Sequence, residues 1–296
     1  LIINGAMQVA QRGTSSTSSG YQTVDRISTS FGGHDEAPAT SQVDVSSGTT
    51  PYTEGFRKAF KIQNGNQSNG AGATDYLACN YTIEAQDIAT SGWNYIDPDS
   101  KLTIQFWAKS SVAKTFILSL YTQDNTDRAY NHKYALSADT WTKITHTFPG
   151  YSGLTFETDN GVGIQFMFIQ YFGTSYTSGS TVDQWVTYTG STSTPDDTAD
   201  WWTTNNATFE ITGLQLEVGS TATAFEHRSY GEELLLCKRY FQNHAPTNSD
   251  HMMWGTGRAE SNTGRIGLPI SVPMRAAPTL ATTQNLSLIH ISEPTR

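Results

Sequence analysis

Charged residues are scarce in this sequence, making up 15% of its 296 residues. Acidic residues outnumber basic residues, 27 to 18, and the formal net charge is −9. A chain with this balance is repelled by a phosphate backbone and by an anionic membrane surface. The sequence therefore predicts no nucleic-acid partner and no membrane insertion.

Cysteine is also rare. Cys79 and Cys237 lie far apart in the sequence, and neither has cysteines or histidines near it at the spacing of a zinc site. We expect two buried thiols that are neither paired with each other nor bound to a metal.

Long apolar runs are missing. No stretch approaches the roughly 18 consecutive apolar residues of a membrane span, and no basic segment precedes an apolar one as in a signal peptide. Because residue 1 is Leu1 rather than methionine, we expect the natural N-terminus to lie upstream.

The short motifs of common enzymes are missing too. There is no G-x-S-x-G, no H-E-x-x-H and no P-loop, so the chain is predicted not to be an enzyme. A glycan-degrading enzyme fragment remains the second alternative, because glycosidase carboxylates can lie far apart in a sequence. Such an enzyme would draw on Glu84, Asp87, Glu157 or Asp159.

Because charged residues are scarce, neutral residues such as serine, threonine and glycine must cover much of the surface. The 25 glycines and 10 prolines are typical of short strands joined by tight turns. Within residues 102–109, Leu102, Ile104 and Phe106 alternate with Thr103 and Gln105, which predicts a strand. Similar segments are residues 1–12, 21–31, 56–62, 76–83, 115–122, 130–136, 140–148, 161–172 and 207–218. The pattern predicts an all-β antiparallel sandwich.

Two segments interrupt the strands. Residues 173–200 are rich in Thr, Ser, Gly and Asp and predict a long functional or mobile loop. Ser229 and Glu232 form a capping box, which predicts a helix over residues 229–241. The predicted domains are a sandwich over 1–228, this linker helix, and a truncated second β domain over 242–285 with strands at 264–272 and 276–281.

Residues 286–296 read LSLIHISEPTR, which resembles the conceptual translation of a sequencing-library adapter. Segments of this origin are left out of fold reasoning. We therefore expect a metagenomic fragment whose native sequence stops near Asn285.

Two terminal signatures carry a family resemblance. Residues 1–13 read LIINGAMQVAQRG and precede Val24-Asp25-Arg26, while 209–219 read FEITGLQLEVG and precede FEHRSYGEEL and CKRY at 225–234 and 237–240. These segments resemble tail-fibre and appendage structural proteins of marine tailed bacteriophages, over nearly all of residues 1–241. Residues 274–279, MRAAPT, resemble the entry to that family's next domain. The resemblance implies a jelly roll similar to carbohydrate-binding modules and a virion appendage that meets a host surface.

Sugar sites on β-sandwiches combine flat aromatic faces with hydrogen-bonding side chains. We expect that chemistry in two places, and the glycan-binding candidates are Trp93, Tyr95, Trp185, Trp201, Trp202 and Asp200. The alternative is that these aromatic residues pack over sheet edges or against other subunits. Trp107 and Trp141 lie in strongly patterned strands and are expected in the core.

No metal site is predicted. Asp97 with Asp99, or Asp196 with Asp197, offer calcium ligands, but each pair falls short of the roughly six to eight oxygens required. Calcium is therefore the only cofactor considered, and none is expected. His132 and His146 show no partner constellation and are expected on the surface or within the sheet.

Three functions follow from these patterns. The first is a tail-fibre-like module of the virion that attaches to host-surface glycans, within a homotrimeric fibre or as a decoration on one, and acts outside the cell. The alternative is a purely structural module for fibre or baseplate assembly with other virion subunits. The second alternative is the enzyme fragment named above.

Overall fold

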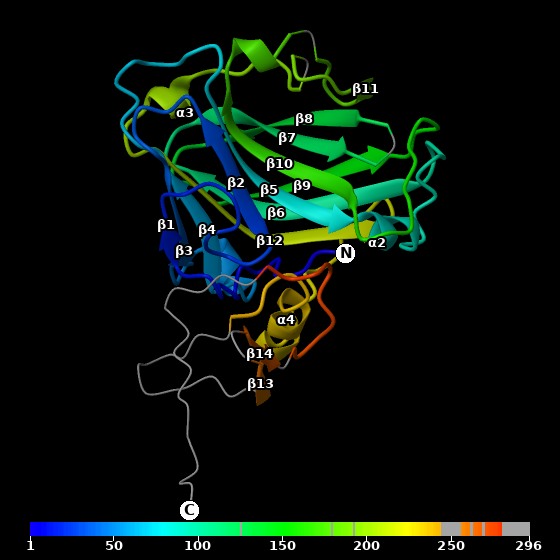
Figure 1. Ribbon diagram of the computed structural model, residues 1–296. Helices are drawn as coiled ribbons and strands as arrows, with labels where there is room; N and C mark the ends of the chain where they lie inside the picture. Colours follow the sequence, from blue (N-terminus) through cyan, green and yellow to red (C-terminus); the bar gives the residue numbers. More distant parts are fainter. Residues whose placement is uncertain are drawn as a thin grey trace, which may run out of the picture.

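The computed structural model describes residues 1–243 apart from 125, 179 and 192, together with 256–260, 263–267 and 270–279. Its strands form two antiparallel six-stranded sheets that pack face to face (Figure 1). In hydrogen-bonded order, the first sheet contains β1 (Ser15–Ser16), β3 (Ala39–Asp44), β4 (Lys58–Gln63), β12 (Thr208–Val218), β6 (Lys101–Ser110) and β9 (Thr142–Pro149). The second contains β11 (Trp185–Thr187), β8 (Arg128–Leu136), β7 (Lys114–Thr122), β10 (Val162–Phe172), β5 (Tyr76–Glu84) and β2 (Ile27–Gly32). The chain is a jelly-roll β-sandwich, as the sequence predicted.

The core lies between the sheets, where the alternating apolar residues of both meet. Phe106 of β6 and Phe168 of β10 are fully buried, and their ring centroids lie 5.0 Å apart at 81°. Edge-to-face pairs of this kind stabilise a core beyond the area they bury. Cys79 also lies in this core, and both cysteines are buried free thiols, which confirms the prediction for them.

Each sheet also carries an apolar cluster on its outer face. On the first sheet, Phe56, Ala59 and Trp107 are buried together, so Trp107 lies in this outer cluster rather than between the sheets, with half-buried Trp141 packed beside it. On the second sheet, Ile117, Met167 and Ile169 are buried together with Tyr176 packed against them, and Tyr188 stacks on Tyr121 with ring centroids 4.0 Å apart. The segment predicted as a functional or mobile loop is thus packed against the sheet.

Residues 1–12 are not a strand, which corrects the prediction. Their backbone turns through left-handed conformations at Asn4 and Met7, with φ of 60° and 56°. The Asn4 side chain donates to the carbonyls of Val9 and Asp25 at 2.9 Å each, so side-chain hydrogen bonds replace a strand ladder. The apolar spacing that suggested a strand reflects burial of Ile2, Met7 and Val9 without regular structure.

A glycine marks the irregularity of β12. Gly213 has φ of 65°, and the pairing of β12 with β6 shifts between Thr212 and Gln215. A Cβ at this position would lie 2.8 Å from the Phe56 ring, so both the backbone and the packing require glycine.

The helices are short: α1 (Thr50–Thr53), α2 (Ala85–Ala89), α3 (Asp200–Thr203), α4 (Tyr230–Cys237) and the single turn η1 (Thr174–Tyr176). The predicted capping box of α4 is present, with the Ser229 hydroxyl accepting from the Glu232 amide and the Glu232 carboxylate accepting from the Ser229 amide. No helix in the described chain is long and apolar enough to cross a membrane. In Figure 1, α4 and the N-terminus lie at the lower end of the sandwich and β11 lies at the upper end.

Beyond α4, the structure describes residues 238–243, a hairpin of β13 (Thr256–Glu260) and β14 (Thr263–Gly267), and residues 270–279. The expected strand at 264–272 overlaps β14, whereas residues 276–279 form no strand. The remainder of the expected second domain and the adapter-like residues 286–296 lie outside the described residues, so both remain predictions.

Candidate functional site

Three of the six candidate residues, Trp93, Trp201 and Trp202, are core residues, which corrects the prediction for them. Trp201 and Trp202 lie on α3 and are 0% exposed. Their indole N–H groups donate to the carbonyls of Thr208 and Gly70, each at 3.1 Å. Because α3 inserts both indoles into the sandwich, neither ring offers a face to a ligand. Asp200, which begins α3, is exposed but has no exposed aromatic ring from α3 beside it.

Trp93 is corrected in the same way, since it is only 3% exposed and donates its indole N–H to the Ser100 carbonyl at 3.3 Å. Tyr95 remains half-buried at the surface, and its ring packs edge-on against Phe156 with centroids 4.9 Å apart. Of the first predicted pair, Tyr95 alone therefore stays accessible.

Trp185 also remains at the surface, on the edge strand β11. Its indole N–H donates to the Pro149 carbonyl at 2.9 Å, which ties β11 of the second sheet to the end of β9 in the first. Its ring lies nearly parallel to that of half-buried Tyr151, at 17° with centroids 6.3 Å apart. The Tyr151 amide in turn donates to the Tyr95 carbonyl at 2.7 Å. We call Tyr95, Tyr151 and Trp185 the aromatic edge.

Polar groups flank the aromatic edge. The guanidinium carbon of Arg128 lies 5.6 Å from the centre of the Tyr151 ring, and Arg128 also donates to the Thr187 hydroxyl. Tyr151 and Arg128 were not among the binding residues predicted from the sequence. The pairing of β6 with β9 is the signal that could have identified Tyr151. Because the two strands are antiparallel and Lys101 pairs with Pro149, the chain just before residue 101, which contains Tyr95, and the chain just after residue 149, which contains Tyr151, lie at the same end of this strand pair.

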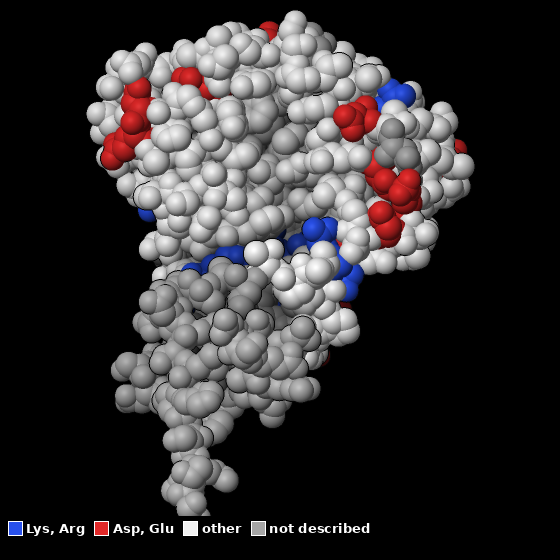
Figure 2. Space-filling view, viewed as in Figure 1, with Lys and Arg blue, Asp and Glu red and all other residues white. Residues whose placement is uncertain are grey.

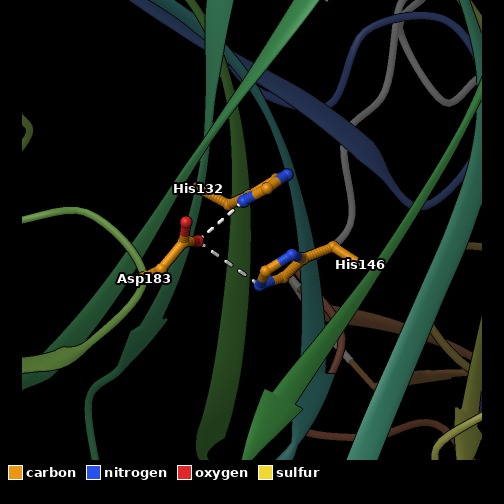
Figure 3. A group of neighbouring side chains, drawn as sticks. All are labelled: His132, His146 and Asp183. Carbon is orange, nitrogen blue, oxygen red and sulfur yellow. Dashed lines mark hydrogen bonds and ion pairs between the residues drawn. The ribbon is translucent and has the colours of Figure 1, made fainter.

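A second cluster lies beside the aromatic edge, where β8 and β9 approach each other from different sheets. His132 of β8 and His146 of β9 stack with ring centroids 3.7 Å apart at 22°. The Asp183 carboxylate oxygen Oδ1 lies 2.7 Å from Nδ1 of His132 and 3.8 Å from Nε2 of His146 (Figure 3). The expectation that these histidines have no partner constellation is wrong, because their partners come from another sheet and a loop.

The electrostatics of the cluster keep His146 neutral. Burial, and then the neighbouring His132, lower the pKa of His146 from 6.5 to about 4, although Asp183 opposes the shift. Its Nε2 atom is buried and has no hydrogen-bond partner. A buried ring nitrogen without a partner is uncommon in native proteins. Tyr130 closes the cluster on its inner side, with ring centroids 5.6 Å from His146 and 5.4 Å from Trp185.

The acidic pairs considered for calcium are engaged otherwise. Asp197 accepts from the ammonium of Lys114 at 2.8 Å, and the two side chains are only 2% and 1% exposed. Asp97 accepts from the Asp99 amide at 2.9 Å within its own loop. In the part of the chain that the structure describes, neither pair gathers a third carboxylate.

In the described chain, no three of the four acids named for the enzyme alternative bring their carboxylate oxygens within 4.8 Å of one another. Glu84 is buried and bound by the Arg239 guanidinium through two hydrogen bonds of 3.0 and 2.7 Å. Asp87, Glu157 and Asp159 are exposed. Glu84 thus binds Arg239 and so anchors the segment that follows α4.

A pocket of about 390 Å³ lies where the sandwich meets α4, and its lining includes Arg12, Arg26 and Arg275. Figure 2 shows Lys and Arg side chains gathered in a band where the sandwich meets the C-terminal part of the chain. Arg12 stacks on Phe241 at 3.8 Å, and Arg275 donates to the Asn160 carbonyl at 2.5 Å. Arg26 likewise stacks on Tyr240 at 3.5 Å, so these cations contact or belong to the C-terminal segment.

No protein-family model matches this chain, and no curated protein matches it. Among solved structures, it is similar to the enzymatically active domain of tailspike protein 4 of bacteriophage CBA120, with 11% identity, a TM-score of 0.37 and coverage of 74% of this chain and 21% of that chain. The family 11 carbohydrate-binding module of Clostridium thermocellum, in complex with a β-1,3-1,4-mixed-linked tetrasaccharide, gives 14% identity, a TM-score of 0.33 and coverage of 71% and 98%. The N-terminal cellulose-binding domain of Cellulomonas fimi β-1,4-glucanase C gives 13% identity and a TM-score of 0.33, with coverage of 72% of this chain and 100% of that chain. This chain spans about a fifth of the tailspike chain, and similarities at these TM-scores carry no inference about function.

Proposed function

We propose that this chain is a carbohydrate-binding module and that the aromatic edge is its sugar-binding surface. The observation that carries the proposal is the nearly parallel pair of Trp185 and Tyr151, two half-buried rings held at the rim by the Trp185–Pro149 hydrogen bond. The apolar faces of sugar rings pack on such aromatic surfaces. Tyr95 extends the same rim, and all three side chains rest against the core, so little side-chain entropy is lost on binding.

The polar groups suit a sugar rather than a purely apolar ligand. Arg128 and Thr187 present a guanidinium and a hydroxyl next to Tyr151, and both types of group bind sugar hydroxyls. We further propose that the module belongs to a tail-fibre-like appendage of a virion and attaches it to host-surface glycans. The two terminal sequence signatures support this wider role.

The test is binding of the full chain to an array of immobilised polysaccharides and oligosaccharides, followed by calorimetry with the best ligand. Replacing an interface aromatic residue that carries binding costs about 2 kcal/mol or more, so Trp185→Ala and Tyr151→Ala should weaken binding roughly 30-fold. Tyr52→Ala is the matched control, because Tyr52 is half-buried and stacked with Arg57 on another part of the surface. Absence of binding to every glycan, or an equal loss in Tyr52→Ala, would overturn the proposal.

We propose that binding is not followed by cleavage. Prolonged incubation with the bound polysaccharide should leave its chain length unchanged in size-exclusion chromatography. Shortened products that disappear in Glu157→Gln or Asp159→Asn would instead support the enzyme alternative.

An assembly role is the second candidate, favoured by the surface of α4. Tyr230, Leu235 and Leu236 are 55%, 52% and 39% exposed, an unusual amount of apolar surface for one short helix. A trimer in light scattering that dissociates in Leu235→Glu would support assembly through α4. A monomer at all concentrations would leave the module to act alone.

A further inference from the structure

We propose that His132, His146 and Asp183 form a binding site for one divalent transition-metal ion of the zinc class. The site goes beyond sugar binding and does not depend on it. In the described chain these three side chains are the one group of at least three His, Cys, Asp or Glu residues whose ligand atoms lie within 4.8 Å of one another. They come from β8, from β9 and from the loop before β11 (Figure 3).

The donor set determines the class of metal. Two imidazole nitrogens and one carboxylate oxygen suit zinc, cobalt, nickel or copper, whereas calcium and magnesium prefer oxygen ligands alone. Three protein ligands leave at least one position of a tetrahedral site for water.

His146 has a ring nitrogen available to bind a metal ion. Its Nε2 atom points at Asp183 and is buried without a hydrogen-bond partner, so a lone pair is available there. A bound ion would give the orphaned nitrogen its partner.

The ligand atoms are close to the spacing that zinc requires. With bonds of about 2.0–2.1 Å, the ligand atoms of a tetrahedral site lie roughly 3.3 Å apart. Oδ1 of Asp183 lies 2.7 Å from the His132 nitrogen and 3.8 Å from the His146 nitrogen, one distance shorter and the other longer than this value. The two rings, now stacked at 22°, must tilt apart for both lone pairs to meet at one ion. Side-chain rotations of His132 and Asp183, which are 21% and 51% exposed, allow this adjustment.

The third ligand is held in place by its backbone. Asp183 has a left-handed conformation with φ of 58°, and its amide donates to the Asn131 carbonyl at 2.8 Å. A metal ion here would join the edges of the two sheets and fix the loop two residues before Trp185. A metal ion that cross-links the two sheets would therefore lie directly beside the aromatic edge.

The test uses the full chain without a histidine tag, stripped with a chelator and then titrated with Zn²⁺ by calorimetry and with Co²⁺ by visible absorption. One equivalent should bind, and the tetrahedral Co²⁺ spectrum should appear and then vanish on addition of Zn²⁺. Since even outer partners of a metal site change affinity ~10–100-fold, His132→Ala, His146→Ala and Asp183→Asn should each weaken Zn²⁺ binding at least ~10-fold. Bound Zn²⁺ should raise the Tm of the wild type and not that of the variants.

His34→Ala is the matched control, because His34 also has a buried ring nitrogen without a hydrogen bond but lies in no such cluster. If His146→Ala fails to fold, the half-exposed Asp183→Asn decides the question alone. No binding by the wild type, or binding that survives Asp183→Asn, or equal loss in His34→Ala, would overturn the metal site. These results are independent of sugar binding, since the glycan array tests Trp185 and Tyr151 and not the three ligands.

Discussion

The guanidinium carbon of Arg26 lies 3.5 Å from the centre of the Tyr240 ring. Arg26 is 6% exposed and belongs to the N-terminal signature, whereas Tyr240 belongs to the signature after α4. Further contacts join the same two segments, including the Asn4 amide, which donates to Glu233 at 2.5 Å. The two signatures that carry the family resemblance thus form one joint between the start of the sandwich and α4.

Tyr240→Ala should therefore weaken this joint. A desolvated cation–π contact contributes about 2 kcal/mol, so the free energy of unfolding in urea should fall by about that amount. Tyr230→Ala is the control, because this tyrosine of the same region is 55% exposed and its loss should leave stability unchanged. If Tyr240→Ala and Tyr230→Ala changed the free energy of unfolding equally, the Arg26–Tyr240 contact would not stabilise the fold.

Lys114→Met should destabilise the fold strongly. Burial lowers the pKa of Lys114 and raises that of Asp197, and each side chain opposes the shift of the other. Removing the cation leaves a buried carboxylate without a counter-ion, which costs about 3–5 kcal/mol in urea unfolding. Lys58→Met should cost under about 1 kcal/mol, because the Lys58–Asp44 pair is solvent-exposed.

The double variant Lys114→Met/Asp197→Leu separates the two contributions. Because it removes both charges, most of the lost stability should return. A double variant that stays as unstable as Lys114→Met would mean that packing, and not the unpaired charge, is responsible.

Acid should weaken the joint through Glu84. Burial raises the pKa of this carboxyl, but hydrogen bonds from Arg239, Tyr240 and Gln86 together outweigh burial and hold the pKa below its usual 4.5. The contribution of Glu84 is therefore present above about pH 4.5 and lost as the pH falls through the lowered pKa of the folded state. In thermal melts, Glu84→Gln should lower the Tm at neutral pH, and its difference from the wild type should shrink below pH 4.5. Parallel pH curves would contradict this linkage.

Trp202→Ala should act on stability and not on the sugar. Removing a fully buried indole leaves a cavity, and the expected loss is about 3–5 kcal/mol in urea unfolding. The folded fraction should keep its glycan affinity, whereas Trp185→Ala should lose affinity with little change in stability. If Trp202→Ala lost glycan affinity without losing stability, Trp202 would be a binding residue after all.

Most of the sandwich could be predicted from the sequence because alternation along a strand is a local property. The predicted strand over residues 102–109 lies within β6, and the one over 161–172 begins one residue before β10 and ends with it. The short edge strands β1 and β11 were not predicted, since two or three residues show no periodicity. The strand predicted over residues 1–12 is wrong because buried apolar side chains do not require regular backbone structure.

The candidate site could be predicted only in part. Trp185 and Trp201 are the same residue type in similarly polar surroundings, yet α3 buries one while β11 leaves the other at the rim. His132 and His146 lie on strands of different sheets, and only the packing of those sheets brings their rings together. Such contacts depend on tertiary structure, which no local pattern reports.

The placement of the chain ends affects how the module would work in many copies. Leu1 and α4 lie at one end of the sandwich and β11 at the other (Figure 1). A carrier joined at the first end would leave β11, the strand that contains Trp185, at the end far from the carrier. If the aromatic edge binds sugar as proposed, copies held side by side would engage several sugars of one surface at once, and weak single contacts would combine into a strong overall avidity.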